Sequence, residues 1–348
     1  MLDDVRLPLA VSLGDPAGIG LDVLCLAWLQ REERGLPPFA VIGCRSAIEA
    51  RARTLGIGVP VEAIERWQHA PCVFAAALPV IDTPLPGPVA AGVPSPANAR
   101  TVIASIERAV DAVRRGDAAA VVTCPIAKSE LYATGFAHPG HTEFLAALAA
   151  KQWPGSHPQP VMMIASEALR VVPLTIHIAL AEVPGAISAA AINATVRVMA
   201  SALTRDFGIA APRIAVTGLN PHAGEDGAMG REEIETIAPA IRALRQAGFD
   251  VSGPHPADTL FHAARRATYD AVLAMYHDQA LIPAKTLAFD TGVNVTLGLP
   301  FVRTSPDHGT AFDVAGTGRA SPESFIAALV MASEMARRRA LAPSGATA

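Results

Sequence analysis

Three histidines in this chain each follow an apolar run that is typical of a buried β-strand. Open α/β sheets bind their ligands beyond the carboxyl ends of such strands. Three neutral imidazoles gathered there could hold a divalent metal ion, most often zinc. Alternatively, each histidine forms only local hydrogen bonds in its loop, since no His-x-x-x-His pair marks a metal site. The histidines are His177 after residues 171–176, His222 after residues 214–219, and His277 after residues 271–276.

Residue types suited to binding an anion form a second group. Residues 140–144 (Gly-His-Thr-Glu-Phe) predict a glycine turn that opens a helix, where backbone N–H groups, an imidazole and a hydroxyl can meet an oxyanion. Further along, Lys285 could supply a point charge and Arg303 a bidentate guanidinium for a phosphate. Because Lys285 stands in an apolar segment, a structural ion pair with Asp290 or Asp307 is an equally good interpretation.

Carboxylates near the histidines could support acid–base chemistry. Asp278 directly follows His277 and could orient that imidazole. Asp258 and Lys285 are both candidates for handling a proton, and their environment in the fold decides between them. Asp258 also follows a proline at the start of an apparent helix, so a helix N-cap is the structural alternative.

Residues 14–20 (Gly-Asp-Pro-Ala-Gly-Ile-Gly) form a glycine-rich turn after a predicted strand. Their spacing differs from the G-x-G-x-x-G fingerprint of Rossmann folds. A nucleotide would therefore occupy a site of another kind.

Short apolar runs alternate with longer amphipathic stretches, which predicts a parallel or mixed α/β sheet. Predicted strands are residues 7–13, 39–43, 118–122, 213–217 and 270–276. Predicted helices are residues 21–33, a stretch from Ser46, and residues 97–115, 184–207, 232–246 and 321–339. A proline-rich segment, residues 82–96, predicts an irregular surface connection.

Length and composition indicate a globular protein with about two domains in its 348 residues. Hydrophobic residue types make up 51% of the chain, which argues against disorder. The formal charge, 28 − 32 = −4, predicts no basic surface for nucleic acid or anionic lipid. We expect no membrane span, no secretory signal at the acidic N-terminus, and no disulfide framework among four scattered cysteines. These features favour a cytoplasmic protein.

Seven segments, together and in this order, resemble the motifs of the 4-hydroxythreonine-4-phosphate dehydrogenase family, whose NAD-dependent enzymes act in pyridoxal phosphate biosynthesis. The resemblance extends from Leu7 to about Glu334. The segments are residues 14–20, 139–145, 218–225, 275–280, 285–289, 292–301 and 303–312.

The resemblance implies an α/β subunit with the two-domain fold of isocitrate and isopropylmalate dehydrogenases, and an active site in the interdomain cleft. We expect residues 1–135 plus about 300–348 to form the first domain. Residues from about 136 to 299 would form the second domain, which carries the metal ligands and the dimer contacts. The resemblance also implies a homodimer with a shared active site.

The same resemblance assigns roles to individual residues and cofactors. It implies NAD, with NADP as a possibility, and one divalent metal ion (Zn, Mg or Co) in each active site. The metal ligands would be His177, His222 and His277, one of them from the partner subunit. The substrate-binding residues would be His141, Thr142, Lys285, Asn294 and Arg303. Separately from the resemblance, we expect the catalytic residues to be Asp258 or Lys285 for proton transfer and Asp278 as the partner of His277.

The implied reaction is the oxidation and decarboxylation of 4-phosphooxy-L-threonine, a small phosphorylated amino acid. Its products would be 3-amino-2-oxopropyl phosphate, CO2 and NADH. One alternative is a related dehydrogenase for another phosphorylated hydroxy acid or a cis-dihydrodiol carboxylate. Another is a metal-dependent hydrolase or lyase that uses the histidines without a nucleotide.

Overall fold

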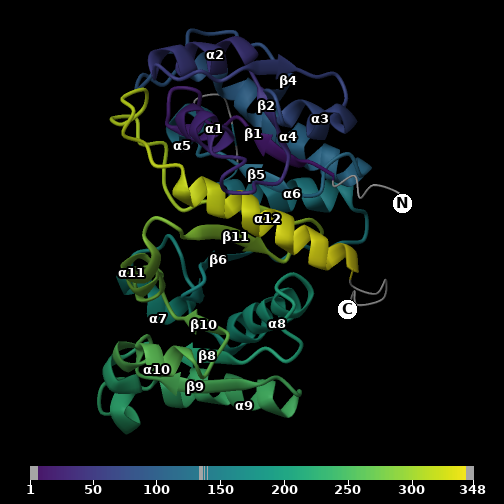
Figure 1. The fold of residues 1–348 in the computed structure, drawn as a ribbon. Helices are drawn as coiled ribbons and strands as arrows, with labels where there is room; N and C mark the ends of the chain where they lie inside the picture. The colour runs from purple at the N-terminus through teal and green to yellow at the C-terminus, as the bar shows by residue number, and fades with distance from the viewer. Residues whose placement is uncertain (1–6, 133–135, 137, 139, 342–348) are drawn as a thin grey trace. The chain divides into compact units, whose positions relative to one another are not determined.

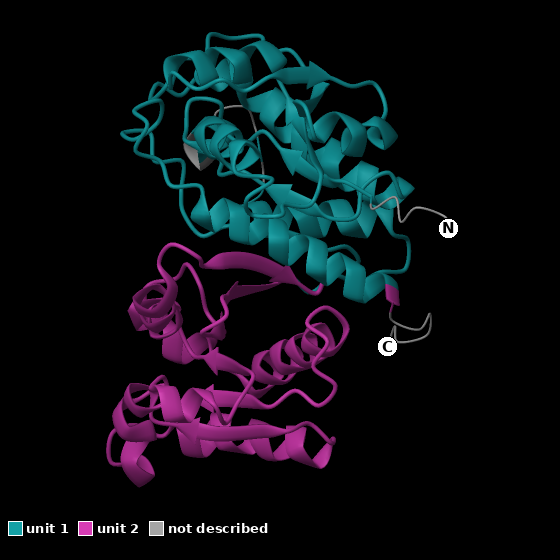
Figure 2. Ribbon diagram, viewed as in Figure 1, with its two compact units in different colours: residues 1–160, 299–340 teal, residues 161–298, 341–348 magenta. Residues whose placement is uncertain are grey.

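The computed structural model describes residues 7–132, 136, 138 and 140–341. The chain divides into two compact units, which Figure 2 shows in different colours. Unit 1 comprises Met1–Pro160 and Leu299–Ala340, and unit 2 comprises Val161–Gly298 together with Leu341. Unit 1 is therefore built from two separate stretches of the chain.

Unit 1 contains six described strands in the spatial order β3-β4-β2-β1-β5-β12, and all their pairings are parallel. The strands are β1 (Leu9–Ser12), β2 (Phe39–Gly43), β3 (Val61–Ala63), β4 (Leu78–Asp82), β5 (Val121–Thr123) and β12 (Arg303–Pro306). The helices are α1 (Gly20–Leu29), α2 (Arg45–Thr54), α3 (Ala70–Phe74), α4 (Ala99–Arg115), α5 (Lys128–Tyr132), α6 (His141–Gln152) and α12 (Glu323–Leu341) (Figure 1).

Helices cover both faces of the unit 1 sheet because its strands are apolar on both sides. On β2, Ala40 and Ile42 pack in one cluster with residues of α4 and α6. Phe39 lies on the opposite face, since side chains alternate along a strand. Its ring contacts Phe74 of α3 at 4.9 Å and Phe325 of α12 at 6.3 Å between ring centroids. Such two-sided burial explains why the strands are continuous apolar runs.

Unit 2 contains six described strands in the order β11-β6-β7-β10-β8-β9. The β11–β6 and β6–β7 pairings are antiparallel, and the β7–β10, β10–β8 and β8–β9 pairings are parallel. The strands are β6 (Val161–Ala165), β7 (Arg170–Pro173), β8 (Ile214–Thr217), β9 (Val251–His255), β10 (Ala271–Ala274) and β11 (Val293–Leu297). The parallel or mixed α/β sheet expected from the sequence is confirmed, since the described strands pair in parallel in unit 1 and in both directions in unit 2.

Unit 2 has five described α-helices. Three are longer than one turn: α8 (Ala189–Arg205), α9 (Ala238–Gln246) and α11 (His277–Ala288). Two are one turn long: α7 (Val183–Ala186) and α10 (Ala263–Arg266). The 3-10 segments include η4 (Pro221–Gly227) and η6 (Ala257–Thr259), and η5 (Glu233–Ile237) is a π-helix. The inner face of α11 packs against β7 and β10 through Ala280, Leu281 and Ala284.

The sequence places the first domain boundary near residue 135, whereas the compact units change over at Pro160 and again at Leu299. Helix α6 explains the difference. Its Phe144 and Leu145 pack in the core of unit 1 with residues of α4 and the sheet.

In the described part of the chain, no single helix combines the length and apolarity needed to cross a membrane. The bent pair Leu180–Ala186 and Ala189–Arg205, with an angle of 88° between its parts, meets the length and composition criteria together.

Candidate active site

Four neighbouring parallel strands of unit 2 end at the same edge of the sheet, and a candidate site residue follows each of them. In the spatial order β7-β10-β8-β9, these residues are His177, His277, His222 and Asp258. The carboxyl ends of parallel strands are where such sheets bind ligands. The expectation that the three histidines lie beyond strand ends is thus met by the fold.

His177 and His277 form a pair. Their ring centroids lie 5.8 Å apart, and the Nδ1 atom of His277 lies 2.7 Å from Oδ1 of Asp278. A carboxylate on one ring nitrogen fixes the tautomer and leaves the Nε2 edge for a ligand. The two imidazoles and their supporting carboxylate therefore fit two ligands of a divalent cation.

His222 does not complete a metal site with that pair inside one chain. Among the described residues, no three His, Cys, Asp or Glu side chains lie close enough together to hold a metal ion. His222 is exposed, in the turn that follows β8. A ligand set of three histidines is therefore not assembled among the described residues of one chain.

The backbone that carries His222 is left-handed. All five residues from His222 to Asp226 have positive φ, between 41° and 80°. Only Gly224 among them is a glycine, and other L-residues lose roughly 1–2 kcal/mol each in this conformation. Strain of this kind persists only where surrounding contacts hold it, and it concentrates at functional sites.

Gln279 ties the carboxyl ends of β8 and β10 together. Its Oε1 accepts hydrogen bonds from the Thr217 hydroxyl at 2.6 Å and the Met275 backbone N–H at 2.7 Å. Its Nε2 donates to the Gly218 carbonyl at 2.9 Å. The loops that carry His222 and His277 are therefore joined through one side-chain amide.

Two adjoining pockets lie along α11. One, of about 440 Å³, is lined by His277, Asp278 and Lys285 together with apolar side chains. The other, of about 380 Å³, is lined by Asp258, Asp278 and Gln279. Lys285 lies with its Nζ 5.6 Å from the centre of the Phe289 ring. Both candidates for proton transfer thus line a pocket that Asp278 also lines.

Asp258 lies in a short 3-10 turn, and Asn294 lies on a strand of unit 2. Asp258 lies inside the 3-10 turn η6, whose N-cap is Pro256, so the alternative role as an N-cap is not observed. Asn294 lies on β11 opposite Ile164 of β6. Its Oδ1 is buried and has no hydrogen-bond partner among the described residues. A buried amide oxygen of this kind is suited to a ligand that donates a hydrogen bond.

The candidate phosphate-binding residues of unit 1 meet at the start of α6. Gly140 is the extended N-cap of this 12-residue helix, and His141 and Thr142 form its first turn, as the glycine turn in the sequence predicts. Arg303, at the start of β12, donates to the Thr123 hydroxyl at 2.7 Å and to His141 Nδ1 at 3.4 Å. Its side chain is 3% exposed, and burial lowers its pKa to about 10.

The contacts of Arg303 make this cluster a candidate anion site. A guanidinium taken out of water loses its hydration, and an oxyanion compensates that loss well because it accepts bidentate hydrogen bonds. The N-terminus of α6 adds backbone N–H groups and the positive end of the helix dipole. Lys285 and Asn294 belong to unit 2, so this cluster holds three of the five predicted substrate-binding residues.

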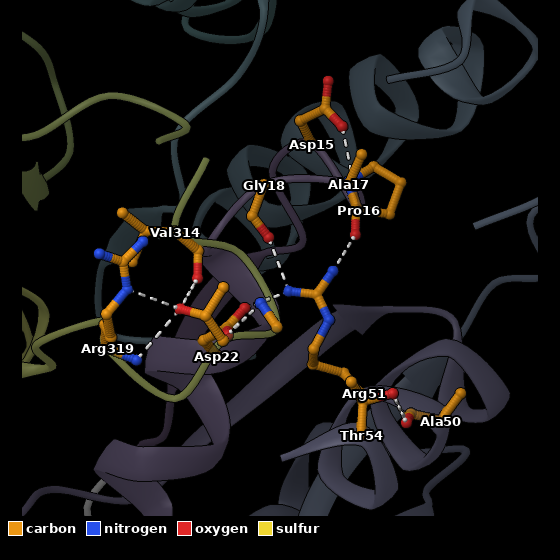
Figure 3. Close-up of polar contacts among 12 residues, drawn as sticks. Asp15, Pro16, Ala17, Gly18, Asp22, Ala50, Arg51, Thr54, Val314 and Arg319 are labelled. Carbon is orange, nitrogen blue, oxygen red and sulfur yellow. Dashed lines mark hydrogen bonds and ion pairs between the residues drawn. The ribbon is translucent and has the colours of Figure 1, made fainter. Parts of the chain in front are cut away.

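A buried arginine organises the glycine-rich turn at residues 14–20 (Figure 3). Arg51 of α2 forms an ion pair with Asp22 of α1 and donates to the carbonyls of Gly18 at 2.9 Å and Pro16 at 3.1 Å. Asp22 also accepts a 2.8 Å hydrogen bond from the backbone N–H of Gly316. One ion pair therefore joins the turn to a loop from the other end of the chain.

Glu233, Gln279, Thr123 and Arg51 were not singled out by the sequence patterns. Each lies in a helix or strand, and its partners come from other segments of the chain. Only the cluster of glycines at residues 218, 224, 227 and 230 signals an unusual backbone near His222.

Comparison with known proteins gives consistent matches along the chain. A family model described as pyridoxal phosphate biosynthetic protein PdxA matches residues 36–332. The curated 4-hydroxythreonine-4-phosphate dehydrogenase of Methylorubrum populi is 57% identical over 342 residues, which cover 98% of this chain and 97% of that protein.

Solved structures agree with these matches. The crystal structure of 4-hydroxythreonine-4-phosphate dehydrogenase from Klebsiella pneumoniae has a TM-score of 0.83 and 37% identity, and the match covers 96% of this chain and 99% of that one. A terephthalate 1,2-cis-dihydrodiol dehydrogenase from Burkholderia xenovorans LB400 has a TM-score of 0.61 and 28% identity, with coverage of 94% and 98%.

Proposed function

Because the chain belongs to the family of the pyridoxal phosphate biosynthetic protein PdxA, we propose that it converts 4-phosphooxy-L-threonine and NAD into 3-amino-2-oxopropyl phosphate, CO2 and NADH. The family that the sequence motifs indicate is confirmed by these comparisons. Its members are dehydrogenases, so the chain is an oxidoreductase that requires a nicotinamide cofactor. NAD rather than NADP is part of the proposal.

The phosphate end of the substrate binds at the Arg303 cluster of unit 1 in this proposal. The buried guanidinium, the His141 ring and the first turn of α6 together supply the charge and the donors that a phosphate needs. Binding energy from this unreactive end holds the carbinol carbon in place during hydride transfer. A cis-dihydrodiol carboxylate has no phosphate to occupy the cluster, so the observed cluster favours the phosphorylated substrate.

The single observation that carries the proposed chemistry is the pair of imidazoles of His177 and His277, with the Asp278 carboxylate against Nδ1 of His277. These side chains would hold a divalent cation (Zn, Mg or Co), with His222 of the partner subunit as a third ligand. When bound, the cation and the nicotinamide supply a Lewis acid for the substrate hydroxyl and an acceptor for hydride.

Lys285 and Asp258 are the groups available for moving protons. In this proposal one of them takes the proton from the substrate hydroxyl as hydride leaves the carbon that bears this hydroxyl. A group in the same pockets returns a proton to the carbon from which CO2 departs. Lys285 shares its pocket with His277, which favours it for the first of these steps.

Two features of unit 2 support a homodimer as part of the proposal. Its candidate metal ligands are incomplete within one chain, and large apolar side chains are exposed close to them in sequence. Ile178 and Leu180 follow His177, Ile282 lies on α11 and Phe289 is its C-cap, and their exposed fractions lie between 42% and 72%. An exposed apolar surface of this kind is typical of a protein interface.

Assay of the purified protein with Co2+ and NAD tests the function. We expect NADH to form with 4-phosphooxy-L-threonine and not with a cis-dihydrodiol carboxylate, and His177→Ala to abolish it. A control, His157→Ala, should leave turnover unchanged. Failure of NAD to be reduced with any candidate alcohol, combined with hydrolysis of a phosphate ester, would instead favour a metal-dependent hydrolase.

A further inference from the structure

The turn that carries His222 is held by one buried carboxylate, Glu233. This side chain is 2% exposed. Its Oε1 accepts the backbone N–H groups of Leu219 and Asn220, both at 2.8 Å, and its Oε2 accepts the Asn220 side-chain amide at 3.0 Å. Three donors immediately before His222 therefore converge on a single acceptor group.

Two glycines leave the space that this carboxylate occupies. A Cβ atom on Gly224 would lie 2.6 Å from Oε2 of Glu233, and one on Gly218 would lie 3.0 Å from Oε1. Gly224 also has φ +80°, inside the left-handed stretch. The chain thus wraps around the carboxylate before and after His222, and the turn and Glu233 fit each other as a unit.

Glu233 occupies a buried position on a helix face whose other members are apolar. It is the first member of the buried stripe that runs from η5 into α9. The stripe continues with Ile237, Ala240, Ile241 and Leu244, spaced as one helix face. A carboxylate in such a position loses its hydration and is tolerated only when hydrogen bonds replace it. The neighbours Ile234 and Glu235 point to solvent instead.

We propose that Glu233 is a positioning residue that holds His222 in the left-handed conformation required for binding the divalent cation. The inference rests on the proposed function, in which His222 is a metal ligand. Glu233 itself does not touch the cation. It acts by fixing the backbone of residues 219 and 220, from which the strained turn begins.

The variant Glu233→Gln tests this, because it keeps the size of the side chain and removes one of its two acceptor oxygens. Metal-free full-length protein is titrated with Co2+ alone, with visible absorbance and calorimetry as readouts. We expect Glu233→Gln to weaken Co2+ binding about 10-fold or more, the usual effect of losing an outer support of a metal ligand. The control Glu235→Gln removes an exposed charge from the same helix and should bind as wild type.

The double variant with His222→Ala separates positioning from general destabilisation. If Glu233 acts through His222, adding Glu233→Gln to His222→Ala causes no further loss of Co2+ affinity. Independent, additive losses, or wild-type binding by Glu233→Gln, would overturn the inference while leaving the proposed function standing. Wild-type binding by His222→Ala would show instead that the proposed metal role is wrong, and the inference would fall with it.

A second variant covers the case in which Glu233→Gln does not fold. Glu233→Asp keeps both acceptor oxygens and draws them back by one methylene. Folding is checked by the thermal unfolding midpoint without metal. A folded Glu233→Asp protein with undiminished Co2+ affinity and an unchanged Co2+ spectrum would contradict the proposal, and a weakened affinity with a changed spectrum would support it.

Discussion

Arg303 shows how a single side chain gains its function from burial. The sequence identifies a cation that could grip phosphate, and the structure surrounds it with a hydroxyl, an imidazole and a helix N-terminus. A guanidinium in water has little preference for an anion over its hydration shell. One that is 3% exposed has already lost that shell, so an incoming phosphate oxygen competes with no bulk water.

Replacing Arg303 by Met should therefore raise KM for the phosphorylated substrate. Loss of a charge-assisted pair is worth about 2 kcal/mol, which corresponds to roughly 30-fold. Steady-state NADH formation measures this, with Arg45→Met as a control because Arg45 is exposed and its side chain forms an ion pair with Glu49 of the same helix. A KM close to that of wild type would show that Arg303 does not contact the phosphate.

The Asp278 carboxylate should matter for metal affinity rather than for folding, because it is 70% exposed and contacts the ring of His277. Asp278→Asn weakens the hydrogen bond that fixes the tautomer of the His277 ring. We therefore expect about 10-fold to 100-fold lower Co2+ affinity, with little change in the thermal unfolding midpoint. Calorimetry on the metal-free protein gives the affinity. Unchanged binding would argue that the carboxylate is only a surface neighbour of the ring.

Individual residues were predictable from the sequence where their chemistry is visible locally. His177, His222 and His277 follow apolar runs, so their place beyond strand ends could be inferred from the pattern of β7, β8 and β10. Glu233 and Gln279 could not be inferred. Each lies in a helical segment whose sequence does not indicate its role. Both form their hydrogen bonds with the loop that follows β8, which is distant in the sequence.

At the scale of elements, β8 and β10 are tied together at both ends. Gln279 joins their carboxyl ends. Arg213 joins their beginnings through three hydrogen bonds to the carboxylate of Asp270, at 2.8, 3.0 and 3.1 Å. Fixing two adjacent parallel strands at both ends limits how far the loops beyond them can separate. Rigid elements of this kind are what a precisely positioned site requires.

The Asp270 pair predicts a specific pH dependence. Burial alone would raise the pKa of Asp270, but hydrogen bonds and the charge of Arg213 lower it below its usual 3.8. The pair therefore stabilises the fold fully above pH 3.8, and this stabilisation is lost as the pH falls through the folded-state pKa. Asp270→Asn should lower the urea midpoint at pH 7, and its difference from wild type should shrink below pH 3.8.

A control for this pH effect is Asp111→Asn on the surface of α4, whose pairs with Arg114 and Arg115 are exposed and worth little. Its urea midpoint should follow that of wild type throughout. A constant difference for Asp270→Asn at every pH would show that the loss comes from packing and not from charge.

The Arg51–Asp22 pair plays the corresponding part among the elements of unit 1, because it joins α1, α2 and the turn at residues 14–20 (Figure 3). Arg51→Met leaves the Asp22 carboxylate buried without its cation, which should cost about 3–5 kcal/mol of unfolding free energy. Urea unfolding measures it. The second change Asp22→Asn should recover part of the loss, and no recovery would mean that the arginine acts through packing alone.

The elements themselves were partly predictable. Residues 39–43 were predicted as a strand and form β2, and residues 97–115 were predicted as a helix and contain α4. Strand β9 was not predicted, because it contains Gly253 and Pro254, which are typical of a turn. Strand β12 was not predicted, because it begins with the charged Arg303 and the sequence does not show that this residue is buried by tertiary partners.

At the scale of the whole molecule, the decisive question is whether two chains share each site. His177 and His277 pair within one chain, and no described group of three potential ligands forms around them. A two-fold symmetric dimer would complete the ligand sets of both sites, because a symmetric interface brings the same surface of each chain into contact.

Mixing two inactive variants tests this sharing. His222→Ala and His277→Ala homodimers should each be inactive, but after subunit exchange a mixed dimer retains one intact site. Since half of the dimers are mixed and each has one of two sites intact, about a quarter of wild-type activity should return. Activity that stays at zero after confirmed exchange would show that each site is built from one chain.

The split path of unit 1 has a consequence for how the chain is made. Strand β12 and helix α12, with the Phe325 that covers Phe39, follow unit 2 in the chain, and nearly all of unit 2 is the continuous segment Val161–Gly298. On the ribosome, this face of the unit 1 sheet therefore stays uncovered until unit 2 has been synthesised. Nascent chains of this protein should depend on chaperones in that interval, and truncation after residue 298 should yield aggregates rather than an isolated first unit.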